Sequence, residues 1–245
     1  MWPNVGEVHV WRAMRSDHTL LDQVAAGLSE DETGWAQRLC RTSDRNLYVL
    51  AHAFMRDILA RYLGVAPSDV RFERGPHGKP YLTGNNRQDL CFNLSHSRDA
   101  ILLALTSKTE VGVDIEYNEP LDDLMDIAGR FFAPDELAAL AAHRGENRVS
   151  FFYRLWTRKE SYLKACGKGL SYPLTSFSVM PSLGVIADPI VRGPQISSEQ
   201  GWYCYGLPAP AGYAAATALS CEVRVISCWN WPAIECEQVL RFAQV

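Results

Sequence analysis

The sequence lacks paired cysteines. Seven cysteines are spread singly over 245 residues, and none belongs to a C-x-x-C pair: Cys40, Cys91, Cys166, Cys204, Cys221, Cys228 and Cys236. A disulfide framework normally has an even number of cysteines, and a zinc site normally has paired ones. We therefore expect free thiols, with neither a disulfide framework nor a zinc site.

Segments that direct a chain into a membrane are also missing. No apolar run reaches the roughly 20 residues that span a bilayer, and residues 1–11 show no basic segment followed by an apolar one. Basic charge is not in excess either, since the net charge is −4. We therefore expect a cytoplasmic protein that binds neither membranes nor nucleic acid, although a local basic cluster around an anionic ligand is compatible with this charge.

The sequence does contain enough apolar material for a substantial core, with 47% hydrophobic residues. Its residue pattern predicts strands at 5–13, 70–73, 90–95, 100–106, 110–117, 175–180, 183–187, 201–207, 212–219 and 222–228. Apolar residues at helical spacing predict helices at 44–63 and within 121–166. Residues 188–200 are predicted to form a loop. This order predicts an α+β fold of two halves, 1–108 and 109–245, that pack as one body.

Two carboxylates occur on the strand predicted at 110–117. Asp114 and Glu116 are two positions apart, so their side chains project from the same face. Adjacent like charges repel each other unless a cation or a basic group lies between them. Mg²⁺ is a natural cation for such a site, because it prefers oxygen ligands and is usually shared with substrate phosphates. The alternative is the exposed polar face of an edge strand, which this short pattern alone favours.

A second cluster lies on the helix predicted to end near residue 166. Trp156, Glu160 and Lys164 recur at i, i+4 and i+8 and share one helix face. Glu160 could be a third metal ligand or a base toward a hydroxyl, and Lys164 could contact a phosphate. The alternative is an ordinary Glu–Lys surface pair with Trp156 as core filling. Lys159, off this face, is expected to serve the structure or to contact the rim of the site.

Two weaker signals precede these clusters. His96 stands between Ser95 and Ser97 at a predicted strand end, where it can donate to a phosphate or relay a proton near neutral pH. Lys79 is presented by the predicted turn at 78–80. A lone histidine is more often structural, and a lone turn lysine carries little information.

The motifs gain weight from their order along the chain. GKP (78–80), FNLSHS (92–97), GVDIE (112–116), RFF (130–132) and WTRKESYLKACGKGL (156–170) together resemble the Sfp-type 4'-phosphopantetheinyl transferases. The resemblance implies a pseudo-dimer of two similar α+β halves, with the active site between them and a monomer as the working unit. It also implies a reaction in which a serine of an apo acyl or peptidyl carrier protein attacks the β-phosphate of coenzyme A. Phosphopantetheine joins the serine, and adenosine 3',5'-bisphosphate leaves.

For the metal, the resemblance implies that Asp114, Glu116 and Glu160 hold Mg²⁺, which bridges the pyrophosphate and offsets developing charge. Glu160 would also accept the serine proton, either directly or through a water. For coenzyme A, it implies that His96, supported by Ser95, binds a phosphate oxygen. These assignments fit phosphoryl transfer, which depends on positioning and electrostatics.

The resemblance further implies that Lys164 contacts the pyrophosphate and that Lys79 contacts the nucleotide end of coenzyme A. Some members of the family grip the 3'-phosphate with lysines near the N-terminus, but the comparable stretch here, residues 29–35, is acidic. The nearest basic residues flank the start of the helix predicted at 44–63, whose N-terminal end attracts anions. We therefore expect Arg45 to contact coenzyme A, with Arg38 or Arg41 assisting at the 3'-phosphate.

Two other functions remain open at this point. One is a metal-dependent phosphohydrolase that acts on nucleotides through the same acidic cluster. The other is a non-catalytic module that binds coenzyme A or a carrier protein. The complete set of Asp114, Glu116, Glu160 and Lys164 counts against the second alternative, because a binding module has no need of it. The sequence does not identify the natural carrier protein.

Overall fold

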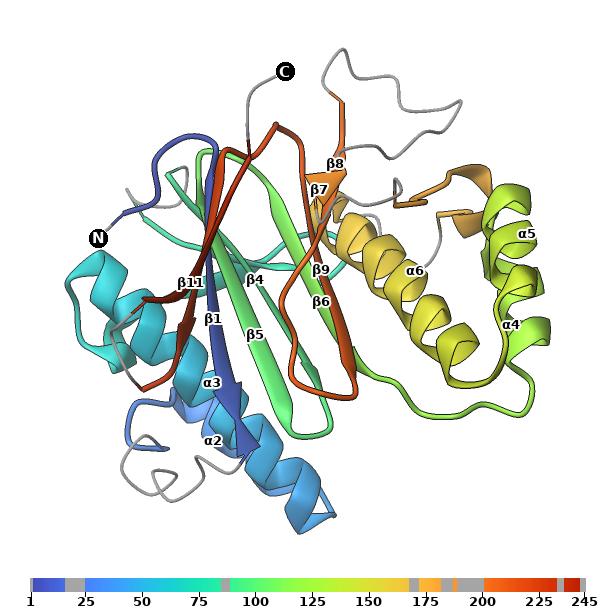
Figure 1. The fold of residues 1–245 in the computed structure, drawn as a ribbon. Coiled ribbons are helices and arrows are strands. Elements are labelled where there is room, and N and C mark those ends of the chain that lie inside the picture. The colour runs from blue at the N-terminus through green and yellow to red at the C-terminus, as the bar shows by residue number, and fades with distance from the viewer. Residues whose placement is uncertain are drawn as a thin grey trace.

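Strands from both ends of the chain assemble into two main sheets, and the fold is α+β, as the sequence predicts (Figure 1). The computed structural model describes residues 2–15, 25–84, 89–167, 172–181, 187–188, 201–232 and 236–242. One main sheet contains the first strand and the other contains the predicted acidic strand. The two sheets lie side by side, with helices on either side of them (Figure 1).

The first sheet has five strands in the order β11–β10–β1–β5–β4. They are β1 (Glu7–Met14), β4 (Leu90–Ser97), β5 (Ala100–Ser107), β10 (Val225–Asn230) and β11 (Cys236–Arg241). β1 runs parallel to β10 and antiparallel to β5. The last strands of the chain therefore join the sheet of the first half. The boundary expected at residue 108 would place β10 and β11 in the second half, and this boundary stays a prediction.

The second sheet has four strands in the order β6–β9–β8–β7. They are β6 (Val111–Tyr117), β7 (Ala187–Asp188), β8 (Tyr203–Gly206) and β9 (Tyr213–Leu219), and their pairs are antiparallel. A separate small pair is formed by β2 (Phe72–Arg74) and β3 (Pro80–Leu82). β4 and β6 are therefore the edges at which the two main sheets meet.

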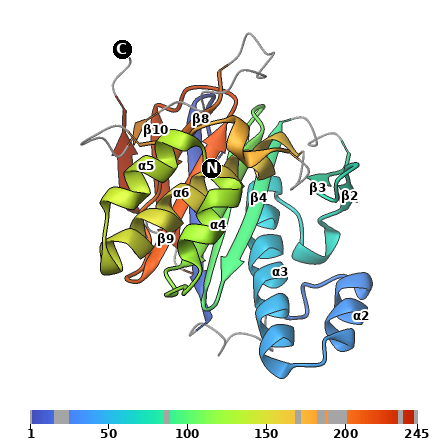
Figure 2. The same ribbon diagram turned by 90° about the vertical axis from the view of Figure 1, so that its right-hand side faces the viewer.

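Each main sheet is covered by one helix of 22 residues. α3 (Thr42–Leu63), with α2 (Glu30–Arg38) beside it, packs on the five-stranded sheet, and α6 (Gly145–Cys166) packs on β6 and β9. α4 (Leu124–Phe131) and α5 (Pro134–Ala142) lie next to α6, and two short 3-10 helices occur at Pro67–Asp69 and Leu174–Ser176. In the turned view, β4 lies between α6 and α3 (Figure 2). Among the described residues, no helix has the length and apolar character needed to cross a membrane.

Residues 175–180 do not form the strand that the sequence predicts. A 3-10 turn occupies Leu174–Ser176 and Ser178 makes only an isolated β-bridge, while side chains also hold the backbone of the buried Phe177 and Val179. Lys159 donates to the carbonyl of Phe177, and Glu136 accepts from the amide of Val179. The predicted strand at 183–187 and loop at 188–200 lie mostly outside the described residues.

Lys159 is completely buried and ties this segment to α6. Its ammonium donates to the carbonyl oxygens of Leu174 at 2.7 Å and Phe177 at 2.8 Å, and it lies 2.9 Å from Glu136 Oε2. Burial lowers the pKa of Lys159 and raises the pKa of Glu136, and the attraction between the two charges opposes both shifts. Of the two roles expected for Lys159, the structural one is therefore confirmed.

Lys159→Met is expected to lower the free energy of unfolding by about 3–5 kcal/mol, because the buried Glu136 carboxylate loses its counter-charge. Urea unfolding followed by circular dichroism measures this change. Lys108→Met is the control, since the Lys108 side chain is 66% exposed, and it should cost less than about 0.5 kcal/mol. The double variant Lys159→Met/Glu136→Gln should lose less than the sum of its single variants. Strict additivity would contradict a buried pair.

Candidate active site

The two sheets are joined by side chains where β4 runs beside β6. Alternate residues of β4 accept hydrogen bonds from alternate backbone amides of β6, and each bond spans 20 residues of sequence. The three pairs are Val113 to Asn93 Oδ1 (2.8 Å), Ile115 to Ser95 Oγ (3.4 Å) and Tyr117 to Ser97 Oγ (3.1 Å). We call this contact the β4–β6 junction. It holds the two halves of the chain at a defined distance.

Asp114 and Glu116 project from β6 at this junction. They share the face of the strand with Gly112, where a Cβ atom would lie 2.0 Å from the carbonyl oxygen of Ser161 on α6. Only a glycine permits so close an approach, so the GVDIE segment brings α6 directly against the strand. Asp114 is 3% exposed, whereas Glu116 is partly exposed. The strand period and Gly112 together place both carboxylates next to the helix.

Lys164 reaches from α6 to Asp114. Its Nζ lies 2.7 Å from Asp114 Oδ1 and 2.8 Å from Ser95 Oγ, and the Ser95 hydroxyl donates to the same carboxylate oxygen at 2.9 Å. The other oxygen, Asp114 Oδ2, is buried and has no hydrogen-bond partner among the described residues. Leaving a buried carboxylate oxygen without a partner is costly. A bound water or cation at this oxygen would remove that cost.

The carboxylates lie close enough to influence one another. Burial raises the pKa of Asp114, and the charge of Lys164 opposes this shift. Burial also raises the pKa of Glu116, against the effect of a hydrogen bond from Ser97. The pKa of Glu160 rises to about 6, first because of burial and then because of the negative charge of Asp114. A cation between these groups would relieve their mutual repulsion.

The residues at this site fit a divalent cation by their chemistry. Asp114, Glu116 and Glu160 offer oxygen ligands of the kind that Mg²⁺ prefers, and Asp114 Oδ2 is without a partner among the described residues. In the described ranges, however, no three acidic, histidine or cysteine side chains converge into a metal-binding cluster as they stand. The positive charge next to Asp114 is that of Lys164. The set of three ligands stays a prediction, and it requires side-chain movement.

His96 lies on β4 but on the opposite face from Ser95, since neighbouring residues of a strand alternate. His96 shares its face of β4 with Leu94, which packs against the hydrophobic core beneath α3. His96 is exposed, and the pKa of its imidazole is lowered, first by partial desolvation and then by the charge of Lys164. The ring can therefore reach a ligand, whereas Ser95 is engaged with Asp114 and Lys164. The support of His96 by Ser95 stays a prediction.

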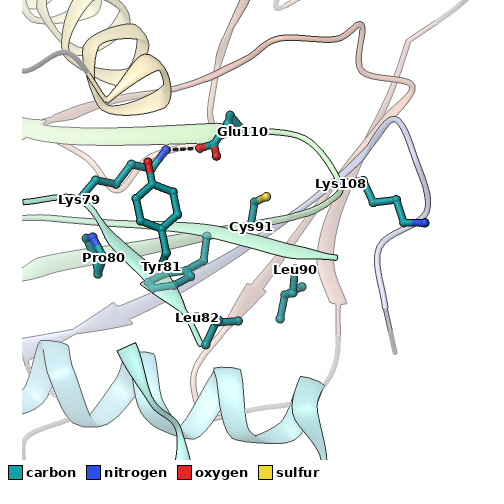
Figure 3. A pocket seen from close by; sticks show the side chains of 9 residues that line it. Lys79, Pro80, Tyr81, Leu82, Leu90, Cys91, Lys108 and Glu110 are labelled. Atoms are coloured by element: carbon teal, nitrogen blue, oxygen red, sulfur yellow. Dashed lines mark hydrogen bonds and ion pairs between the residues drawn. The ribbon is translucent and has the colours of Figure 1, made fainter. Parts of the chain in front are cut away.

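Lys79 is held by the protein itself. Its Nζ lies 2.6 Å from Glu110 Oε2, 3.0 Å from the carbonyl oxygen of Ala165 and 3.2 Å from that of Val111. Figure 3 shows Lys79 pointing toward Glu110, beside Tyr81 and a cavity of about 420 Å³. These three bonds use all the donors of an ammonium group. A contact with the nucleotide end of coenzyme A, which stays a prediction, would have to replace one of them.

Two further cavities adjoin β4. One, of about 230 Å³, is lined by Glu160 and Lys164 together with Asn93 and Leu94. Asn93 and Leu94 also line a larger cavity of about 820 Å³ next to α2 and α3. Its wall carries both basic and acidic side chains: His52, Arg56, Arg71 and Arg74, and Glu30, Asp31, Glu32 and Glu73. An extended anionic ligand could therefore pass from the carboxylates into a cavity whose wall includes arginines.

The arginines predicted to hold the 3'-phosphate are not among the residues that line this larger cavity. Arg38 ends α2, Arg41 immediately precedes α3, and Arg45 lies in the first turn of α3. Arg45 donates to the carbonyl oxygen of Leu39 at 2.9 Å, and its Nε is buried without a partner among the described residues. Their contact with coenzyme A stays a prediction.

The structure also gives positions to two residues without an assigned role in the sequence, Asn93 and Ser97. Both belong to the FNLSHS motif, and both alternate with Ser95 on one face of β4. Three small polar side chains at alternate positions of a predicted strand are an unusual surface for a sheet interior. From this pattern the sequence could have predicted that the side chains of β4 contact another element.

The chain is similar in sequence to known proteins. The family model described as the 4'-phosphopantetheinyl transferase superfamily matches residues 110–217, and one described as 4'-phosphopantetheinyl transferase, N-terminal, matches residues 9–108. The chain is 39% identical to the 4'-phosphopantetheinyl transferase HetI of Nostoc sp., over 67% of this chain and 70% of that protein. It is 35% identical to the 4'-phosphopantetheinyl transferase Sfp of Bacillus subtilis, over 62% and 66% respectively. The holo-[acyl-carrier-protein] synthase of Thermotoga maritima aligns with a TM-score of 0.36 and 19% identity, over 47% of this chain and 65% of that one. Through its two matched segments and its similarity to HetI and Sfp, the chain belongs to the 4'-phosphopantetheinyl transferase superfamily.

Proposed function

We propose that this protein transfers the 4'-phosphopantetheine group of coenzyme A to a serine of an apo acyl or peptidyl carrier protein. A bond forms between the serine oxygen and the β-phosphorus, and the bond from that phosphorus to the bridging oxygen breaks. Adenosine 3',5'-bisphosphate leaves. The observation that supports this most strongly is the buried Oδ2 of Asp114, which has no hydrogen-bond partner in the described part of the chain and lies in an acidic site that a lysine borders.

Mg²⁺ is the cofactor that we propose for the site, with Asp114, Glu116 and Glu160 as its ligands. When bound, it supplies positive charge that offsets the charge of the pyrophosphate. Ser95 and Lys164 hold Asp114 Oδ1 from one side. The other carboxylate oxygen, Oδ2, which has no partner within the described ranges, is therefore the one that we expect to bind the cation.

The remaining groups act on the proton and on the phosphates. Glu160, with a pKa of about 6, is mostly ionised at pH 7 and can accept the serine proton directly or through a water. Lys164 uses two of its three N–H donors within the described protein, so the third can reach a pyrophosphate oxygen. His96 is exposed beside them and can donate to a phosphate.

We further propose that one chain is the working unit. β4 comes from the first half of the chain, and β6 and α6 come from the second, so a single chain supplies both sides of the site. The 820 Å³ cavity, whose wall includes Arg56, Arg71 and Arg74, lies beside the same strand and could accept the nucleotide end of coenzyme A.

The experiment that tests the proposed function is mass spectrometry of several apo carrier proteins after incubation with this protein, coenzyme A and Mg²⁺. Transfer predicts that an acceptor carrier gains one phosphopantetheine group and that adenosine 3',5'-bisphosphate appears in equal amount. Phosphopantetheine released without carrier modification would instead indicate a phosphohydrolase. Binding without any product would indicate a coenzyme A or carrier-protein binding module.

A pH dependence follows from the raised pKa of Glu160. In the metal-free protein this carboxyl becomes protonated as the pH falls through about 6, and a protonated carboxyl does not bind Mg²⁺. The Mg²⁺ concentration for half-maximal activity should therefore rise by up to about tenfold per pH unit below 6, and should be nearly constant between pH 7 and 8. Mg²⁺ titrations of the initial rate from pH 5 to 8 measure this dependence. A constant requirement across the range would remove Glu160 from the metal site.

A further inference from the structure

Two serines of the β4–β6 junction make the same pair of hydrogen bonds. Each serine hydroxyl accepts a hydrogen bond from a backbone amide of β6. The same hydroxyl donates a hydrogen bond to the side-chain carboxylate of the residue one position earlier on β6. For Ser95 the carboxylate is that of Asp114, at 2.9 Å, and for Ser97 it is that of Glu116, at 2.7 Å. The junction thus holds the two halves together and at the same time binds both carboxylates of β6.

The direction of each bond follows from the chemistry of a hydroxyl group. A serine has one proton to donate, and the amide of Tyr117 occupies an acceptor site of Ser97 at 3.1 Å. The proton of Ser97 is therefore directed to Glu116 Oε2. Glu116 is partly exposed, and a glutamate side chain in such a position would otherwise sample several rotamers. Ser97 removes part of that freedom.

We propose that Ser97 is a positioning residue, which fixes the Glu116 carboxylate so that a divalent cation meets an ordered ligand. This inference rests on the proposed function, in which Glu116 is a metal ligand. Groups that hydrogen-bond a metal-binding carboxylate typically change metal affinity by 10- to 100-fold. Ser97 itself would touch neither the metal nor the substrate.

The junction contains its own control. Asn93 makes the same kind of contact, accepting from the amide of Val113 at 2.8 Å. The residue that precedes Val113 is Gly112, which has no side chain to hold. Asn93→Ala therefore removes one contact of the junction without releasing a carboxylate, whereas Ser97→Ala removes one contact and releases Glu116.

The test is a Mn²⁺ titration of the purified protein, with the free ion followed by electron paramagnetic resonance. Ser97→Ala should raise the dissociation constant for Mn²⁺ about tenfold, while Ser97→Thr, which keeps the hydroxyl, should stay within about twofold of the wild type. In steady-state assays, Ser97→Ala should need about tenfold more Mg²⁺ for half-maximal rate, and high Mg²⁺ should restore most of its turnover. Asn93→Ala should bind Mn²⁺ as the wild type does.

Glu116→Ala separates failure of this inference from failure of the proposed metal site. If Glu116→Ala loses Mn²⁺ affinity and Ser97→Ala does not, the metal site stands and the role of Ser97 is wrong. An equal loss in Ser97→Ala and Asn93→Ala would also overturn it, because the effect would then belong to the junction as a whole. If Glu116→Ala binds Mn²⁺ normally, Glu116 is not a ligand, and the proposed site fails together with the inference.

Discussion

Asp114→Ala is expected to lower transfer by about 10³-fold or more while the protein stays folded. The variant removes Oδ2, the buried oxygen without a partner among the described residues, and with it the proposed central ligand of the cation. Losing one such electrostatic group commonly costs 10²–10³-fold in turnover. Losing a metal ligand also lowers the affinity of the protein for the cation. Mass spectrometry of the carrier protein over time measures the rate, with circular dichroism as the check on folding.

The fold should tolerate this change because Asp114 is a buried charge. Burial raises the pKa of its carboxyl, so removing it also removes a desolvation cost. Lys164 loses an acceptor, but its side chain is 31% exposed and can turn to water. Asp122→Ala, at an exposed position, is the control and should transfer at the wild-type rate. Near wild-type transfer by Asp114→Ala in Mg²⁺ would contradict the proposed role of Asp114.

Glu160→Gln should lower turnover by at least about 10²-fold, the scale associated with loss of a general base. Glutamine keeps the shape and hydrogen bonding of the side chain but removes the charge that a metal ligand or proton acceptor needs. Coenzyme A binding should weaken less, because Lys164 and His96 remain. Single-turnover transfer separates the chemical step from binding, which is measured by calorimetry with coenzyme A.

Two controls for this variant lie on the same helix. Glu146→Gln is exposed at the start of α6 and should leave turnover unchanged. Trp156 packs between the rings of Phe131 and Phe152, at centroid distances of 5.6 and 5.9 Å. Trp156→Phe should therefore cost stability more than turnover. Equal losses of turnover in Glu160→Gln and Glu146→Gln would remove Glu160 from the chemistry.

Short-range periodicity predicted which residues share a face. Asp114 and Glu116 share a strand face because side chains alternate with a period of two, and Glu160 and Lys164 share a helix face because they are four residues apart. That these two faces meet depends on Gly112 and its close approach to Ser161. A single glycine in a strand pattern signals some close approach, but it does not say which element approaches.

The same limit applies to the lysines. Lys159 and Lys164 stand five residues apart on α6, yet one is completely buried against Glu136 and the other borders the carboxylates of the site. Lys79 looks exposed in a turn, but Glu110 and two backbone carbonyls hold it. Partners of this kind come from distant parts of the chain, so no local pattern identifies them. The pairing of β1 with β10 is a further long-range contact of this kind.

The acidic stretch at 29–35 contained a local signal that the sequence-based prediction did not use. Ser29 and Glu32 form a capping box at the start of α2, in which the Ser29 hydroxyl accepts from the Glu32 amide and the Glu32 carboxylate accepts from the Ser29 amide. Glu32 also lies 2.5 Å from Arg56 and 2.9 Å from His52. The Glu32 carboxylate is therefore neutralised within the fold, which leaves Glu30 and Asp31 as the acidic side chains of this stretch in the wall of the neighbouring cavity.

The central claim is that Asp114, Glu116 and Glu160 hold a divalent cation beside the phosphates of coenzyme A. The most direct measurement is anomalous diffraction from crystals grown with coenzyme A and Mn²⁺. The predicted result is an anomalous peak between β6 and α6, with Asp114 Oδ2, at least one glutamate oxygen and a pyrophosphate oxygen as ligands. A peak elsewhere, or coenzyme A bound with its pyrophosphate away from these carboxylates, would contradict the claim.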